Sequence, residues 1–238
     1  TIATPWAFHT PLLSQGVDIV LASGTKALSG SDRDLWGYVA TNDTPTANSV
    51  MDLLAMRGGI LDWRRADAIL EGLDAASPAH ARRSETATRV AAFLAAHPNV
   101  SEVFHPSRPN HPDAAVIARD YLRHGSLLSF RVAGADEART RHVADVIAMT
   151  TVIRYALSFD GLATKVNHHQ TVSEYFTPPD QLERNGFDRL IRVGVGLEDA
   201  DDLIAALNWA LHHAEAVAPG DVTAWQRSRR AALGRALR

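Results

Sequence analysis

The chain has 238 residues, 46% of them hydrophobic and 21% charged, and its formal net charge is −3. This composition is typical of a globular protein, and it excludes a mainly disordered chain or a strongly basic nucleic-acid binder. The absence of cysteine excludes disulfides, thiolate zinc sites, iron–sulfur clusters and a cysteine nucleophile. No apolar run is long enough to cross a bilayer and no signal peptide opens the chain, so we expect a cytoplasmic protein with no membrane or nucleic-acid partner. Because the first residue is Thr1 rather than Met, we expect a fragment or a processed piece.

Lysine is rare in this chain. Of the 24 basic residues only Lys26 and Lys165 are lysines, and all the others are arginines. Lysine can form imines and can lose its proton when it is buried, whereas arginine does neither readily. A lysine in a special local context is therefore a candidate for chemistry.

The N-terminal part predicts two strands joined by a polar loop. Residues 17–22 form a short apolar run between glycines, which is typical of a buried strand of a parallel sheet. Residues 35–40 predict a second strand. The segment 23–31 between them is rich in glycine and hydroxyl groups, as functional loops often are.

The rest of the chain predicts helices and then an alternation of strands and helices. Residues 46–96 are mainly helical and end in a long helix over 78–96, which we expect to connect two domains. The alternation that follows predicts a small sheet with helices packed on it. The expected strands are 100–105, 127–132, 151–157 and 190–195, the expected helices are 113–122, 137–149 and 201–217, and a loop is expected over 158–185. The basic tail 219–238 is expected to be a solvated helix or a frayed end.

Lys26 follows the first expected strand and has Ser23, Gly24 and Thr25 just before it. Three interpretations are open: a surface lysine in a turn, the lysine of a phosphate-binding loop, and a Schiff-base lysine for pyridoxal phosphate. The spacing of the phosphate-binding loop is absent. The third interpretation fits the local chemistry, because an imine needs a lysine that can be neutral and that faces a cleft at a strand end.

Two separated motifs resemble one enzyme family. Residues 16–30, with the sequence GVDIVLASGTKALSG, resemble the lysine signature of the cysteine/methionine-metabolism family of pyridoxal-phosphate enzymes, which includes cystathionine gamma-synthases, cystathionine gamma-lyases and methionine gamma-lyases. Residues 188–199, DRLIRVGVGLED, resemble its C-terminal motif, and residues 158–161, SFDG, resemble its Ser-Leu-Gly-Gly turn. The motifs occur in the family's order, and the resemblance covers about residues 1–211.

The resemblance implies an α/β protein of the aspartate-aminotransferase type, called fold type I. Residues 1–77 would be the end of the large cofactor-binding domain and would carry the Schiff-base lysine. Residues 78–218 would be the interdomain helix and a complete α+β small domain, followed by the basic tail 219–238.

The resemblance also implies a cofactor, pyridoxal 5′-phosphate, and a set of site residues. Lys26 would hold the cofactor as a Schiff base and then move protons on the substrate, as the catalytic residue. Ser23 and Thr25 would bind the cofactor phosphate. Arg192 would bind the α-carboxylate of an amino-acid substrate in a bidentate contact, and Ser158 would support that carboxylate. No metal site is expected.

The chemistry that the resemblance implies is elimination or replacement at the γ-carbon. The leading interpretation is a γ-lyase of the methionine or cystathionine type, with an unusual leaving group such as that of canavanine among the candidates. The alternative is a γ-replacement synthase of the cystathionine gamma-synthase or O-acylhomoserine sulfhydrylase type. A non-catalytic homologue that acts as a scaffold is a third hypothesis, and the intact Lys26, Ser23, Thr25 and Arg192 argue against it.

The sequence also departs from the family pattern. The family's lysine lies near mid-chain, so we expect the missing N-terminal segment of the same enzyme as a partner, within a homodimer or homotetramer. The Glu-Ser-Leu that comes after the family's turn is replaced by Ala163, Thr164 and Lys165, and the lost carboxylate weakens the case for cystathionine. Lys165, His168 and His169 would either meet a different leaving group or be loop residues in solvent.

Overall fold

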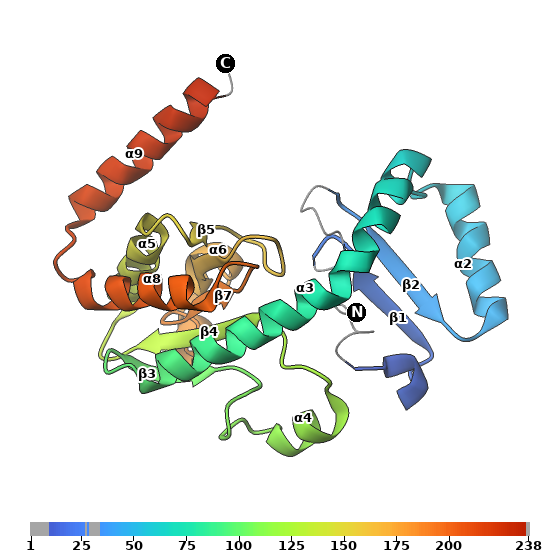
Figure 1. Cartoon of the computed structure of the whole chain (residues 1–238), viewed down its shortest axis with the longest axis horizontal. Helices are drawn as coiled ribbons and strands as arrows, with labels where there is room; N and C mark the ends of the chain where they lie inside the picture. The colour runs from blue at the N-terminus through green and yellow to red at the C-terminus, as the bar shows by residue number, and fades with distance from the viewer. Residues whose placement is uncertain (1–9, 27, 29–33, 237–238) are drawn as a thin grey trace.

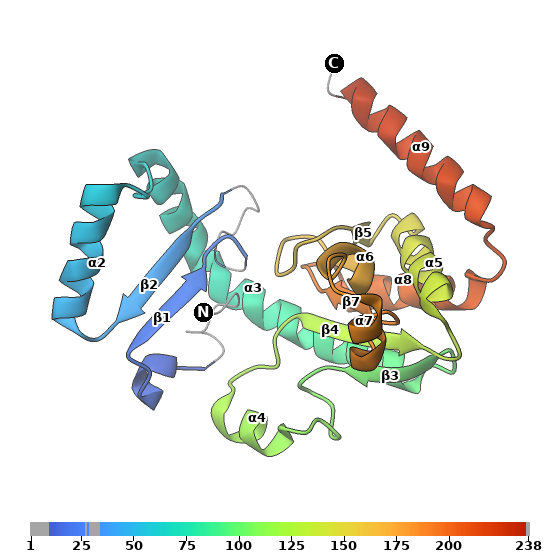
Figure 2. The ribbon, with the colours of Figure 1, turned by 180° about the vertical axis from the view of Figure 1, so that it is seen from behind.

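The computed structural model describes residues 10–26, 28 and 34–236. The expectations for residues 1–9, for positions 27 and 29–31 of the loop around Lys26, and for 237–238 lie outside these residues. In Figure 1 the long helix α3 runs from a two-stranded sheet near the N-terminus to a five-stranded sheet that the C-terminal half of the chain forms, and Figure 2 shows the same arrangement from behind.

The N-terminal region, defined here as residues 12–57, is built on a hairpin-like sheet. It contains η1 (Leu12–Gln15), β1 (Ile19–Ser23), β2 (Gly37–Thr41) and α2 (Thr44–Arg57). The expectation of a parallel strand was wrong, because β1 pairs with β2 in the antiparallel direction. The amides of Gly24 and Thr25 both donate to the Trp36 carbonyl and so continue the antiparallel ladder beyond the strand. Along β1 the side chains alternate between buried and exposed, as they do in a sheet with one open face.

Helix α3 (Trp63–Ala96) is longer than expected. Asp62 caps it by accepting hydrogen bonds from the amides of Arg64 and Arg65, and the helix then continues without a break through Pro78. The sequence favoured a helix start at Pro78, because proline is common in the first turn of a helix and rare in its interior. The division between residues 77 and 78 therefore falls inside one helix.

The C-terminal region, residues 97–217, contains the main core. Its elements are β3 (Val100–Phe104), α4 (Ala114–Asp120), β4 (Leu127–Val132), α5 (Glu137–Met149), β5 (Arg154–Tyr155), β6 (Lys165–His168), α6 (His169–Ser173), α7 (Pro179–Asn185), β7 (Ile191–Gly194) and α8 (Ala200–His213). The strand order is β3-β4-β7-β6-β5, antiparallel except for the last pair. The second half of α3 packs with α5 and α8 over this sheet, and buried aliphatic side chains fill the layer between them.

One strand was missed. Strand β6 lies within the segment that was expected to be a loop, and it takes a central place between β7 and β5. The sequence of β6 does not predict a strand, because two of its buried side chains, Asn167 and His168, are polar. Their hydrogen bonds explain the burial: Asn167 donates to the Ala156 carbonyl, and the His168 ring pairs with the Thr171 hydroxyl and the Asp188 carbonyl.

The basic tail forms helix α9 (Pro219–Ala236), which projects from the C-terminal region in both views. Its first turns are fixed by Val222, which is buried, and by Trp225, which packs against the core. The arginines further along are exposed. Across the described residues, no helix is both long enough and apolar enough to span a membrane.

Candidate active site

The structure brings Lys26 and Ser158 together across 132 residues of sequence. The Lys26 amine donates a hydrogen bond to the Ser158 hydroxyl, with 3.1 Å between Nζ and Oγ. Lys26 follows β1 of the N-terminal region, and Ser158 follows β5 of the C-terminal region. Two of the residues singled out in the sequence thus meet where the two regions approach each other.

Arg192 belongs to the same cluster, because both it and Lys26 lie close to the Phe159 ring. The Lys26 amine is 5.1 Å from the centre of the Phe159 ring, and the Arg192 guanidinium carbon is 5.6 Å from it. Both cations are therefore within the range of a cation–π contact with one ring. The Arg192 guanidinium also donates to the Leu157 carbonyl, next to Ser158. Burial lowers the pKa of Arg192 from its ordinary value, because removal from water disfavours the cation.

Strand β7 sets the position of Arg192. The residue is paired with Ser129 of β4 on one side and with Asn167 of β6 on the other. The neighbours of Arg192 along the strand, Ile191 and Val193, are buried in the core, so the alternation of a strand turns Arg192 to the opposite face.

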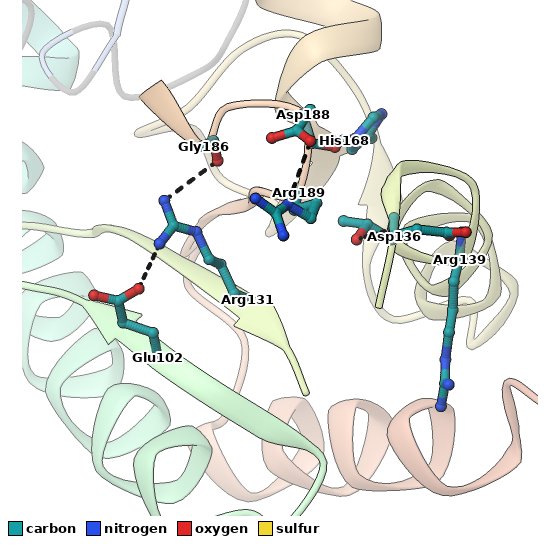
Figure 3. Close-up of polar contacts among 9 residues, drawn as sticks. Glu102, Arg131, Asp136, Arg139, His168, Gly186, Asp188 and Arg189 are labelled. Carbon is teal, nitrogen blue, oxygen red and sulfur yellow. Dashed lines mark hydrogen bonds and ion pairs between the residues drawn. The ribbon is translucent and has the colours of Figure 1, made fainter. Parts of the chain in front are cut away.

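The segment that leads into β7 is also fixed, as Figure 3 shows. Arg131 of β4 donates to Glu102 of β3 at 2.6 Å and to the Gly186 carbonyl at 3.4 Å. Gly186 ends α7 with a φ of +65°, and a Cβ there would lie 2.2 Å from the Arg131 guanidinium. Glycine is therefore favoured at this turn by its left-handed backbone conformation, whereas the Arg131 guanidinium, at the end of a flexible side chain, could move aside for a Cβ.

The two expected phosphate ligands differ in their surroundings. Ser23 is the last residue of β1, half-buried and opposite Gly37 of β2. The Thr25 hydroxyl accepts from the Trp36 amide at 2.9 Å and donates to the Trp36 carbonyl at 3.1 Å. Because this hydroxyl already donates its one proton, Thr25 holds the loop against Trp36 in this conformation. Gly24 lies directly under the Trp36 ring, and a Cβ there would be 2.2 Å from ring carbons.

The histidines and the second lysine are placed by β6. His168 is fully buried, and both of its ring nitrogens are hydrogen-bonded within the fold, with the Asp188 contact visible in Figure 3. It is therefore a structural residue, neither a loop residue in solvent nor a contact for a leaving group. His169 packs edge-on against Phe187, and its pKa is lowered by burial and by the nearby Arg192 charge. Lys165 begins β6 and is paired with Gly194. Within the described ranges, no three His, Asp or Glu side chains gather to hold a metal ion.

Asp160 is a residue of this site that the sequence reasoning missed. It follows Phe159, is 1% exposed, and accepts a hydrogen bond from the buried Ser126 hydroxyl. Burial raises its pKa to about 6, although the charges of Arg83, Lys26 and Lys165 favour the ionised form. A polar residue at a glycine position of the resembled turn was the available signal.

Comparison with known proteins shows to which family the chain is similar. A family model described as Cys/Met metabolism PLP-dependent enzyme matches residues 1–212. Cystathionine gamma-synthase of Mycobacterium tuberculosis is 34% identical over 208 residues, which are 86% of this chain and 52% of that protein. O-succinylhomoserine sulfhydrylase of the same species is 30% identical over 209 residues, again 86% of this chain and 52% of the relative.

A solved structure agrees with these matches. The cystathionine gamma-lyase CalE6 of Micromonospora echinospora superimposes with a TM-score of 0.80 at 25% identity, over 88% of this chain and 54% of its own. The chain thus spans about half the length of the relatives it matches. With a family match over nearly the whole sequence and a fold shared with a member of known structure, the chain belongs to the Cys/Met metabolism PLP-dependent enzyme family.

Proposed function

We propose that this chain carries the lysine-bearing and carboxylate-binding part of a pyridoxal-phosphate enzyme that eliminates the γ-substituent of a sulfur- or heteroatom-substituted amino acid. The observation that carries the proposal is the meeting of Lys26 and Ser158 at 3.1 Å, with Arg192 near the same Phe159 ring as Lys26. An amine, a hydroxyl and a guanidinium from two separate regions converge here, as the binding of a cofactor and an α-amino acid requires. The scaffold hypothesis does not account for this convergence.

The residues at this place fit pyridoxal phosphate. Lys26 supplies the amine for covalent attachment, and Ser23 supplies a hydroxyl for the phosphate. The Thr25 hydroxyl can accept a further hydrogen bond but must leave the Trp36 carbonyl before it can donate to a phosphate oxygen. When bound, the cofactor supplies an electron sink that stabilises negative charge on the substrate carbon skeleton.

Each remaining residue has a part in substrate handling. Arg192 binds the α-carboxylate: a guanidinium has five N–H donors, and the bond to Leu157 leaves room for a bidentate contact. With the cofactor bound, the Lys26 amine would be the base that takes the proton from the substrate Cα and moves protons at Cβ. Ser158 keeps this amine on the substrate side of the cluster by accepting its hydrogen bond.

The second candidate is replacement at the γ-carbon by a sulfur nucleophile. It is supported by the two relatives whose names are those of a synthase and a sulfhydrylase. Elimination and replacement share the removal of the leaving group and differ in the fate of the remaining carbon skeleton. A panel of cystathionine, methionine, O-acylhomoserines and guanidinooxy amino acids separates the two, because a lyase releases a 2-oxo acid without added thiol and a synthase depends on the thiol.

Further polypeptide belongs to the active unit in this proposal. Residues 1–77 are the end of a larger cofactor domain together with the first half of α3, 78–218 are the second half of this interdomain helix and the small domain, and a segment homologous to the rest of the relatives completes the site within a homodimer or homotetramer. Support comes from a groove of about 720 Å³ over β1, β2 and α2, which is lined by apolar side chains such as Leu21, Val39 and Met51. A completed sheet and domain would cover this face.

The experiment is borohydride reduction of the purified protein, together with any chain that copurifies, followed by mass spectrometry. The two lysines of the chain offer a matched pair of variants, Lys26→Arg and Lys165→Arg. We expect a pyridoxyl group on Lys26 in the unmodified protein and in Lys165→Arg, and none in Lys26→Arg. A label that stays after Lys26→Arg, or no label on a preparation that contains the completing segment, would contradict the proposal.

A further inference from the structure

Asp160 occupies an unusual place in the fold. Its backbone has a φ of +56°, a left-handed conformation that glycine adopts without cost and that aspartate tolerates better than most other residues. Its carboxyl is almost completely buried, and its Oδ2 atom accepts no hydrogen bond from the described residues. A buried carboxylate with an unused oxygen costs free energy unless nearby charges compensate for it. The surroundings of Asp160 therefore matter.

Three elements bring positive charge to Asp160. Arg83 comes from α3 and is 2% exposed, Lys26 follows β1, and Lys165 begins β6. The charges of both lysines of the chain thus act on one carboxyl group. The Ser126 hydroxyl, just before β4, donates to the Asp160 Oδ1 atom. On the β7 side the neighbour is Gly194, which carries no charge and allows the turn to pack closely on the strand.

The turn that bears Asp160 also bears Ser158. Arg83 Nε donates to the Gly161 carbonyl at 3.1 Å, in a buried hydrogen bond between α3 and the end of the turn. Ser158, at the start of the turn, accepts from Lys26. Residues 158–161 are therefore held at one end by Arg83 and meet Lys26 at the other, and Asp160 lies between these contacts.

We propose that Asp160 is a positioning residue for Lys26: ionised and partly compensated by Arg83, it fixes the turn 158–161 so that the Ser158 hydroxyl accepts the hydrogen bond of the Lys26 amine. This inference deepens the proposed function and rests on it for the role of Lys26. Helix α3 then has a second role besides connecting the two sheets, because its Arg83 holds the turn of the active site. Protonation of Asp160 removes its attraction for Arg83 and loosens the turn locally, although the fold as a whole is more stable with the neutral carboxyl, because desolvation outweighs that attraction.

The test measures the reactivity of the Lys26 amine without cofactor. Lys26 is acetylated with a limiting amount of acetic anhydride between pH 5 and pH 9, and its rate is compared by mass spectrometry between the unmodified protein and Asp160→Asn. The asparagine keeps the shape and the Ser126 contact but has no charge at any pH. Above pH 7 we expect Lys26 to react about fivefold faster in Asp160→Asn, the factor that corresponds to one net hydrogen bond. As the pH falls to 5 the two rates converge, because Asp160 is then mostly protonated.

Two further variants separate positioning from general destabilisation. Asp145→Asn removes a half-buried carboxyl whose pKa burial raises, on α5, and should leave the Lys26 rate unchanged. Ser158→Ala removes the acceptor, so that adding Asp160→Asn to it should have no further effect on Lys26. Equal rates for Asp160→Asn and the unmodified protein at every pH, or a full additional effect in the Ser158→Ala background, would overturn the inference.

The same proteins distinguish this inference from the proposed function. If acetylation follows the expected pattern but pyridoxal phosphate with borohydride never labels Lys26 in the completed protein, the positioning of Lys26 stands and the cofactor proposal fails. If the cofactor labels Lys26 while acetylation is insensitive to Asp160→Asn, the proposed function stands and the positioning role fails.

Discussion

The N-terminal and C-terminal regions differ in how they bury their apolar side chains. In the C-terminal region Leu207, Val166 and Ile191 are completely inaccessible to solvent between the sheet and helices α3, α5 and α8. In the N-terminal region Leu21 of β1 is 46% exposed, and Met56 of α2 is 84% exposed. The C-terminal region has an interior of its own, and the N-terminal region has an apolar face that the described residues leave open. The candidate site takes its lysine from the open region and its arginine from the closed one.

This difference suggests that the two regions hold their site residues, Arg192 and Lys26, in different ways. A region with a complete core can hold a guanidinium in a fixed place, because packing restricts the strand that carries it. Because the N-terminal region buries few apolar side chains, its loops depend on other contacts for a fixed conformation. For the loop around Lys26 these are the Trp36 contacts of Thr25 and the hydrogen bond to Ser158.

The largest effect is expected from truncating a leucine of the closed core, in contrast to an exposed leucine of the N-terminal region. Leu207→Ala should lower the free energy of unfolding by about 2–5 kcal/mol, since it leaves a cavity in a closed core. Leu53→Ala, at a position that is 53% exposed on α2, should change it by less than about 0.5 kcal/mol. Denaturant unfolding followed by circular dichroism measures both. Equal losses would remove the distinction between the regions, and a large loss at Leu53 only when another chain is bound would identify the cover of the open face.

The second-largest effect is expected for the pH dependence of stability, which the buried carboxyl of Asp160 influences. Its pKa in the folded chain is raised, so between about pH 4 and pH 6 folded Asp160 keeps a proton that the unfolded chain has released. The free energy of unfolding contributed by this group is therefore present below pH 4 and is lost as the pH rises through 6. The gain in the free energy of unfolding that Asp160→Asn produces should be up to about 3 kcal/mol larger at pH 7.5 than at pH 4, since the folded chain binds the Asp160 proton about a hundredfold more tightly than the unfolded chain does.

Thermal unfolding of both proteins at the two pH values measures this prediction. Asp145→Asn is again the control, as the loss of a half-buried carboxyl on α5 whose pKa burial also raises. An unchanged difference between Asp160→Asn and the unmodified protein from pH 4 to pH 7.5 would show that Asp160 is ionised normally.

A smaller effect is expected from the close packing of Gly24 under Trp36. Gly24→Ala places a methyl group where the indole ring lies, so the ring must move, at a cost of about 1–3 kcal/mol. Gly220→Ala is the matched control, because a Cβ there meets nothing within 4 Å and alanine favours a helix. Unfolding measurements and near-ultraviolet circular dichroism report the two changes. An unaffected Gly24→Ala protein would mean that the loop before Lys26 is not held by Trp36.

The smallest effect is expected at the carboxylate site. Arg192→Lys keeps the charge but loses the planar pair of donors, and should weaken the binding of amino-acid substrates about tenfold, or about 1.4 kcal/mol. Arg189→Lys is the control, since Arg189 is exposed and pairs with its neighbour Asp188. The Michaelis constants of the complete holoenzyme give the comparison. If Arg192→Lys left them unchanged while Arg189→Lys raised them, the carboxylate would have to be bound elsewhere.

Most of the C-terminal region could be predicted from its sequence. The strand over 127–132 and the helix over 137–149 have the bounds that were expected, because their apolar side chains repeat at the periods of a strand and a helix. Strand β6 could not be predicted in this way, since its burial depends on hydrogen bonds from Asn167 and His168 to distant parts of the chain. The antiparallel pairing of β1 with β2 could not be predicted from the sequence of β1 either, because the direction of pairing depends on the partner strand.

By itself the sequence determined which residues can carry the chemistry. The rarity of lysine, the small hydroxyl residues around Lys26 and the segment around Arg192 are local patterns, and they are readable without a fold. Only the tertiary structure decided that Ser158 is within hydrogen-bonding distance of Lys26, that His168 is structural, and that Asp160 is buried in a turn that Arg83 holds. The physical reason is that these relations join residues far apart in the chain, and burial and charge act through space.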